Sequence, residues 1–256
     1  MNRIDHTFRQ LRENGRKALI PYIMAGDPSL ERTKKYVLDL ESAGADIIEL
    51  GVPFSDPLAD GPTIQQAAER SLHKGTTLKK VLSLVKEIRK DSNIPLILMT
   101  YFNPVFKFGI ESFVRDAVSK GVDGVIIPDL IPDEAGDFVK LAKQYGLDTI
   151  FLLAPTSTGD RIHKVSQVSS GFIYYVSITG ITGSKLTTGN TMKSTLNAIK
   201  KRARQPIAVG FGISNAREAK KVAKLADGVI IGSAIVKLIH QKKSIINFVK
   251  EIRTAV

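Results

Sequence analysis

The stretch Ala43-Gly44-Ala45-Asp46-Ile47-Ile48-Glu49-Leu50-Gly51 joins the end of an amphipathic segment directly to a short apolar run. A glycine after a helical pattern predicts the end of a helix, and the apolar run predicts a strand that starts at once. Similar junctions recur at Lys120-Gly121-Val122-Asp123-Gly124 and Leu225-Ala226-Asp227-Gly228. The chain is therefore expected to repeat one unit, in which each helix leads straight into the next strand.

Outward from this junction, apolar runs rich in Ile and Val alternate with amphipathic segments along the chain. The predicted strands cover residues 18–24, 46–50, 95–101, 124–127, 149–153, 172–177, 207–210 and 228–231. The predicted helices cover residues 30–43, 78–90, 110–120, 133–145, 159–168, 192–203, 215–225 and 234–253, and an extra helix covers residues 2–14. Runs that are apolar almost throughout are typical of parallel strands buried on both faces.

Eight strand–helix units predict an α/β fold, a single (β/α)8 TIM barrel with an extra N-terminal helix, formed as one domain by residues 1–256. A barrel of this kind typically takes about 250 residues. A doubly wound open sheet is the alternative. That fold usually carries a glycine-rich nucleotide loop after its first strand, and the stretch Ala25-Gly26-Asp27-Pro28 lacks this pattern.

Composition excludes several classes of function. The chain has no cysteine, which excludes disulfides, thiolate catalysis and cysteine zinc sites. Its apolar runs are too short to span a bilayer and it begins without an apolar signal segment, so we expect a cytoplasmic protein with no membrane contact. The net charge of +12 makes nucleic acid a partner to consider. However, the lysines of residues 78–90 lie opposite an apolar helix face, as on a solvated surface, so no nucleic-acid role is expected.

Two acidic residues are the candidates for chemistry. Glu49 comes near the end of the second predicted strand, and barrels of this kind carry their active sites at the strand ends. Burial in an apolar strand raises the pKa of a carboxyl group and suits it to acid–base work, although a hydrogen bond to a neighbouring strand would be a purely structural explanation. Asp60 follows in a proline-rich loop, where alone it would be a turn or cap residue. Two carboxylates in different environments can divide acid and base roles.

The stretch Glu49-Leu50-Gly51-Val52-Pro53-Phe54-Ser55-Asp56-Pro57-Leu58-Ala59-Asp60-Gly61-Pro62-Thr63-Ile64-Gln65 closely resembles the signature of the tryptophan synthase alpha chain family. The resemblance continues at residues 21–28, 99–104, 128–132, 180–183, 210–213 and 232–234. It implies a lyase of tryptophan biosynthesis that splits indole-3-glycerol phosphate into indole and glyceraldehyde 3-phosphate. Glu49 then shuttles protons, and Asp60 stabilises the positive charge that develops on the indole nitrogen. No metal and no cofactor are expected in this chain.

Three glycine-bearing turns follow the last predicted strands, at residues 179–184, 209–214 and 231–234. Such turns let a phosphate approach bare backbone amides, so they predict a phosphorylated substrate. By resemblance, the substrate-binding residues are Tyr22, Tyr101, Tyr174, Thr182, Gly183, Phe211, Gly212, Gly232 and Ser233. Core packing is the alternative role for the aromatic residues. The segment 179–191 predicts a lid, and the chain departs from some family members at Ile178 and Tyr22, where they carry arginine and phenylalanine.

The resemblance also implies a partner. It predicts an α2β2 complex with a beta subunit that holds pyridoxal phosphate, with Pro53 and Asp56 at the contact. Three alternatives stay open at this point: another phosphate-binding barrel such as an isomerase or an indoleglycerol-phosphate synthase, a non-enzymatic barrel that only activates a partner, and a basic nucleic-acid binder. A synthase is expected to place a lysine at a strand end, and none is seen at the predicted strand ends. The intact acidic pair argues against a non-enzymatic barrel.

Overall fold

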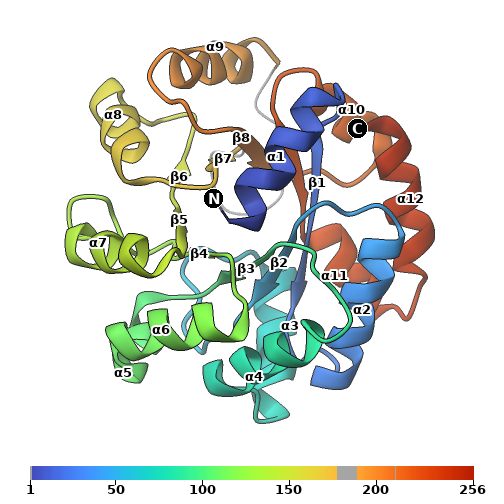
Figure 1. Ribbon diagram of the computed structural model, residues 1–256. Helices are drawn as coiled ribbons and strands as arrows, with labels where there is room; N and C mark the ends of the chain where they lie inside the picture. The colour runs from blue at the N-terminus through green and yellow to red at the C-terminus, as the bar shows by residue number, and fades with distance from the viewer. Residues whose placement is uncertain (1, 178–188, 211) are drawn as a thin grey trace.

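The barrel predicted from the sequence is present in the computed structural model, which describes residues 2–177, 189–210 and 212–256. Every strand pairing among these residues is parallel, and the strands follow the order β5-β4-β3-β2-β1-β9-β8-β7-β6. The strands are β1 Ala18–Met24, β2 Ile48–Gly51, β3 Leu96–Met99, β4 Gly124–Ile126, β5 Asp148–Ile150, β6 Leu152–Leu153, β7 Ile173–Val176, β8 Ile207–Gly210 and β9 Gly228–Ile231. Figure 1 shows them at the centre of a ring of helices.

The ring closes through one interrupted strand. β5 pairs with β4 and β6 pairs with β7, and only Phe151 separates β5 from β6. The backbone N–H of Tyr174 donates to the carbonyl oxygen of Phe151 at 3.1 Å, which continues the pairing across the interruption. The two short strands are thus the single strand predicted over residues 149–153, and the sheet is a (β/α)8 barrel.

Helices cover the outside of the barrel (Figure 1). They are α1 Arg3–Glu13, α2 Leu30–Ser42, α3 Pro62–His73, α4 Leu78–Ile88, α5 Phe102–Phe108, α6 Ile110–Lys120, α7 Gly136–Tyr145, α8 Gly159–Val168, α9 Gly189–Lys200, α10 Ala216–Ala223, α11 Ser233–His240 and α12 Ile245–Ala255. Four of them, α3, α5, α11 and α12, differ from the sequence prediction. α3 and α5 were not predicted, and the helix predicted over residues 234–253 is two helices, with Lys242 between them at φ 55°.

The strands bury both faces, in two separate layers. Leu19 and Ile23 of β1 face the outer helices, whereas Ile20 and Tyr22 point into the barrel. The interior layer reaches α1, whose Phe8 ring lies 5.6 Å from that of Phe172. Burial on both faces explains why the runs are apolar throughout rather than alternating.

The aspartates of the helix-to-strand junctions have a defined role. Asp46, Asp123 and Asp227 each precede a strand and accept a hydrogen bond from a backbone N–H at or next to the start of the neighbouring strand. These bonds are 2.8 to 3.0 Å long. At the remaining junction of this kind, the Ser170 hydroxyl accepts from the Thr149 N–H at 2.8 Å. The recurring aspartate therefore fixes the register of adjacent strands at the N-terminal end of the barrel.

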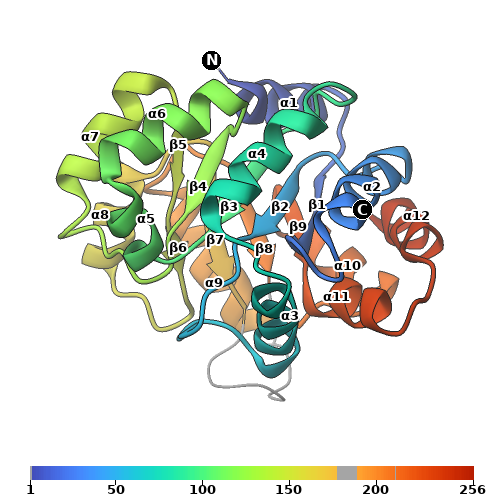
Figure 2. The same ribbon diagram turned by 90° about the horizontal axis from the view of Figure 1, so that it is seen from below.

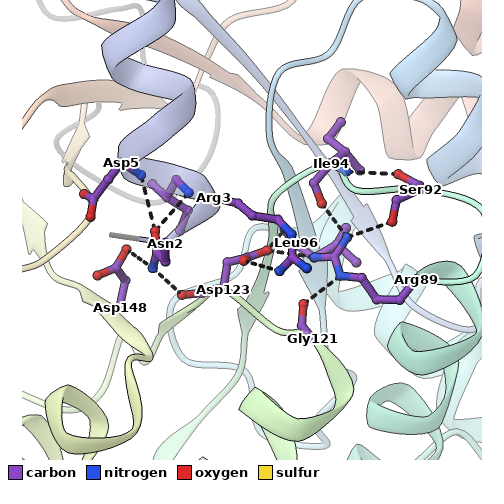
Figure 3. Close-up of polar contacts among 11 residues, drawn as sticks. Asn2, Arg3, Asp5, Arg89, Ser92, Ile94, Leu96, Gly121, Asp123 and Asp148 are labelled. Carbon is purple, nitrogen blue, oxygen red and sulfur yellow. Dashed lines mark hydrogen bonds and ion pairs between the residues drawn. The ribbon is translucent and has the colours of Figure 1, made fainter.

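Helix α1 closes that N-terminal end (Figure 2). The Asn2 side chain caps the helix and also donates to the Asp123 carbonyl and the Asp148 carboxylate. Figure 3 shows Arg3 and Arg89 on opposite oxygens of the Asp123 carboxylate, at 2.9 and 2.7 Å. α3, which follows the β2 loop, lies toward the opposite end of the barrel (Figure 2). Among the described residues, no helix is long and apolar enough to cross a membrane.

Candidate active site

The predicted acidic pair and three predicted tyrosines share one place at the C-terminal ends of the strands. Glu49 on β2 is in register with Tyr22 on β1, and Tyr174 on β7 belongs to the same interior layer of the barrel. The pKa of Tyr22 is raised first by burial and then by Asp60, Glu49, Tyr101 and Tyr174. A charge shifts a neighbouring pKa appreciably when it lies within about 4–6 Å, so the five side chains form one site.

Glu49 is the most deeply buried of these groups, with 1% of its surface exposed. Within the part of the chain that the structure describes, its Oε2 atom has no hydrogen-bond partner. Burial and, to a smaller extent, the charge of Asp60 raise the pKa of this carboxyl group to about 8. A buried carboxyl without a partner is expensive to ionise, so Glu49 stays protonated over much of the neutral range.

Asp60 lies in the loop between β2 and α3 and is only partly buried. Burial raises the pKa of its carboxyl group to about 6, while a hydrogen bond with Tyr101 lowers it. The Gln65 side chain holds the Asp60 carbonyl at 2.8 Å. The two carboxyl groups therefore differ in the pH at which they ionise, and Asp60 loses its proton first.

Two tyrosine hydroxyls occupy space that a glycine leaves open on the next strand. A Cβ atom at Gly51 would lie 2.0 Å from the Tyr22 hydroxyl, and one at Gly210 would lie 2.3 Å from that of Tyr174. The charges of Glu49 and Asp60, after burial, raise the pKa of both tyrosines. Both hydroxyls remain protonated. The two glycines were not predicted as site residues, although a strand that ends in glycine beside a strand with tyrosine is a visible signal.

The glycine turns are described in part. Gly212 adopts φ 77°, a conformation that favours glycine, and Gly232 precedes α11 directly after β9. Ser233 is exposed at the first position of that helix. Gly232 also adjoins the acidic site, because a Cβ atom there would lie 3.4 Å from the Cβ of Tyr22. The predicted residues Thr182, Gly183 and Phe211, the departure at Ile178 and residues 179–188 of the lid predicted over 179–191 lie outside the described residues. The last three residues of that predicted lid, 189–191, begin helix α9.

The two predicted partner-contact residues lie in the β2 loop. Pro53 is buried, whereas Asp56 is exposed and accepts a 2.5 Å hydrogen bond from the neighbouring Ser55 hydroxyl. Next to them, the Leu58 side chain is 91% exposed. The loop thus has a buried base and an exposed tip.

A parallel eight-stranded barrel with two unequally titrating carboxyl groups at its strand ends defines a (β/α)8-barrel enzyme. Residues 8–255 match the family profile described as Tryptophan synthase alpha chain. The chain belongs to the tryptophan synthase alpha chain family and is an enzyme of tryptophan synthesis.

Similar proteins cover nearly the whole chain. The tryptophan synthase alpha chain of Geotalea daltonii is 54% identical over 241 residues, which are 94% of this chain and 91% of that protein. The tryptophan synthase alpha chain of Geobacter sulfurreducens is 48% identical over 262 residues, and the match covers 100% of this chain and 99% of that protein. The structure of the alpha subunit from Legionella pneumophila superposes with a TM-score of 0.91 at 38% identity, covering 100% of this chain and 98% of the other. A Mycobacterium tuberculosis tryptophan synthase structure superposes with a TM-score of 0.93 at 35% identity, and the match covers 100% of this chain and 98% of the other.

Proposed function

We propose that this chain, as one domain over residues 1–256, cleaves indole-3-glycerol phosphate into indole and glyceraldehyde 3-phosphate, a carbon–carbon lyase reaction. The observation that carries the proposal is Glu49, a carboxyl group buried at a strand end, with no hydrogen-bond partner among the described residues and with Asp60 beside it. Nothing in the packing of the barrel requires a carboxyl group there, and its burial opposes folding once the group ionises.

Glu49 supplies the proton transfers. Protonation of indole C3 breaks the aromaticity of the ring, and loss of the side-chain hydroxyl proton then forms the aldehyde as the carbon–carbon bond breaks. The bonding electrons return to the ring, which becomes indole. A group with a pKa of about 8 is suited to both steps, because it readily gives and takes a proton near neutral pH.

Asp60 supplies the negative charge. The indole nitrogen becomes positive when C3 is protonated, so a carboxylate fixed beside its N–H stabilises the intermediate more than the substrate. With a pKa of about 6, Asp60 is ionised at neutral pH while Glu49 is still largely protonated. The two groups therefore hold the protonation states that the first step needs.

The phosphate is proposed to bind at Gly212, Gly232 and Ser233. α11 begins at Ser233 without a side-chain cap from the described residues, so its first backbone N–H groups are available to an anion. Tyr22 lies between this helix and the acidic pair, because it adjoins Gly232 and is in register with Glu49. Thr182, Gly183 and Phe211 are added to this set by resemblance alone.

We further propose a beta subunit as partner, in an α2β2 complex, with pyridoxal phosphate in that subunit and a cytoplasmic location. Pro53 and Asp56 are the proposed contacts. In support, three large apolar side chains are exposed in the segments that follow β2, β3 and β4: Leu58, Phe106 and Ile131, with 91%, 66% and 39% of their surface exposed. Neighbouring loops of a parallel barrel open on one face, and exposed apolar groups on one face favour a protein partner.

The proposal is tested by incubating the purified chain with indole-3-glycerol phosphate, with and without a cognate beta subunit. Indole and triose phosphate should appear in equal amounts, since one carbon–carbon bond yields both. If neither product appears, both with and without the beta subunit, the lyase function is refuted. Indole without triose phosphate would refute the proposed bond cleavage.

A further inference from the structure

The loop that carries Asp60 contacts the side chain of Tyr101 through both the hydroxyl and the ring. This residue follows β3 and stands at the N-cap of α5. Its backbone is itself held, because the next residue, Phe102, donates its N–H to the Asp129 carboxylate at 2.9 and 3.2 Å. Asp129 follows β4, so Tyr101 is supported from the adjacent strand end.

The Tyr101 hydroxyl makes two bonds to consecutive residues of the β2 loop. Its oxygen accepts from the Ala59 N–H at 3.0 Å, and it donates a hydrogen bond to the Asp60 carboxyl group that lowers the pKa of that group. A phenol oxygen accepts and donates at the same time, so one group fixes both a backbone amide and the neighbouring side chain. The Tyr101 side chain is 3% exposed, so the hydroxyl is presented to the loop from a buried position.

The Tyr101 ring fixes the other limb of the loop. Its centroid lies 5.3 Å from that of Phe54, with an interplanar angle of 31°. Phe54 opens the loop and Ala59 is near its end, and between them Ser55, Asp56 and Leu58 are exposed. Tyr101 therefore contacts both limbs while the tip projects into solvent.

We propose that Tyr101 is a positioning residue, which orients the Asp60 carboxylate toward the indole nitrogen by holding both limbs of the β2 loop. The inference rests on the proposed lyase function. It assigns the hydroxyl a role distinct from lining the pocket: the bonds to Ala59 and Asp60 set where the negative charge stands, and the donated proton favours the ionised carboxylate.

The test is Tyr101→Phe, which keeps the ring against Phe54 and removes only the hydroxyl. We expect kcat for indole formation to fall about 10- to 100-fold with KM changed less than about 3-fold, since orientation acts on the transition state. Loss of a donor to the carboxylate raises the pKa of Asp60. The acidic limb of the pH–kcat profile should therefore move to higher pH, which a merely destabilised protein would not show.

A second measurement needs no turnover. Hydrogen exchange at the Ala59 amide should become faster in Tyr101→Phe, because its acceptor is lost. Tyr145→Phe, on the distant helix α7, is the matched control and should change neither kcat nor Ala59 exchange. Phe54→Leu keeps the hydroxyl and should shift the acidic limb less than Tyr101→Phe.

Two outcomes overturn the inference: a Tyr101→Phe enzyme with kcat within about twofold of the parent and an unmoved acidic limb, or unchanged exchange at Ala59. Both leave the lyase function standing as long as the parent chain releases indole. If the parent releases none, the lyase function fails first, and the Ala59 exchange still reports whether Tyr101 holds the loop.

Discussion

The two ends of this barrel treat buried carboxylates in opposite ways. At the N-terminal end, Asp123 is 3% exposed and receives Arg3, Arg89 and the Leu96 N–H (Figure 3). At the C-terminal end, Glu49 is 1% exposed, and its Oε2 atom has no partner among the described residues. The two carboxyl groups are buried to a similar extent, but only that of Asp123 is fully paired.

The difference separates a structural acid from a chemical one. A fully paired carboxylate holds strands and helices together but has no capacity left for a substrate. An unpaired buried carboxyl opposes folding and is free to exchange a proton. The N-terminal end therefore contributes stability that offsets the cost of the site at the other end.

The largest effect is expected for Glu49→Gln, which tests whether the unpaired carboxyl group does the chemistry. The amide keeps the volume but cannot transfer protons, so indole release should fall about 10²- to 10⁴-fold. Glu87→Gln, an exposed change on α4, is the control and should be neutral. Glu49 is not the acid–base group if its variant keeps more than about a tenth of the parent turnover.

Asp60→Asn should lower kcat by about 10- to 10³-fold, with KM affected much less. Its charge matters chiefly as the indole nitrogen becomes positive, so the loss appears in turnover. Steady-state kinetics of indole release measure both constants. A normal kcat with a raised KM would assign Asp60 to substrate binding instead.

At the opposite end, Asp123→Ala should reduce the free energy of unfolding by about 3 kcal/mol, because two arginines lose their buried partner. Urea denaturation measures this loss. Asp116→Ala removes the more exposed ion pair with Lys120 and should cost less than about 1 kcal/mol. Equal losses in the two variants would mean that the Asp123 network is not a stabilising centre.

The smallest effect concerns pH and stability. A carboxyl whose pKa rises to about 8 on folding favours the native state while it is neutral. This contribution is complete below the pKa of the unfolded chain, about 4.5, and is lost as pH rises through about 8. The stability advantage of Glu49→Gln over the parent should thus grow by about 1 kcal/mol between pH 7 and pH 9. Parallel stability curves over that range would argue against the raised pKa.

The sequence predicted the fold because burial on both faces leaves its mark in each strand, and Glu49 was visible as a charge in such a run. α3 was missed because its buried face is made of Ala67, Ala68 and Ser71, which give little apolar contrast. Long-range partners such as Arg3 and Asp123, 120 residues apart, leave no local pattern. For the same reason, the reach of Tyr101 to Ala59 became visible only in three dimensions.

The junction bonds at the N-terminal end also divide the barrel into four pairs of strands. Asp46, Asp123, Ser170 and Asp227 each bind a backbone N–H of the preceding strand, once for every two strands around the ring. The barrel therefore has a fourfold internal repeat at this end, with one side-chain bond inside each pair of strands. In the pair that uses Ser170, Asp148 lies beside the junction, where a second carboxylate would be repelled.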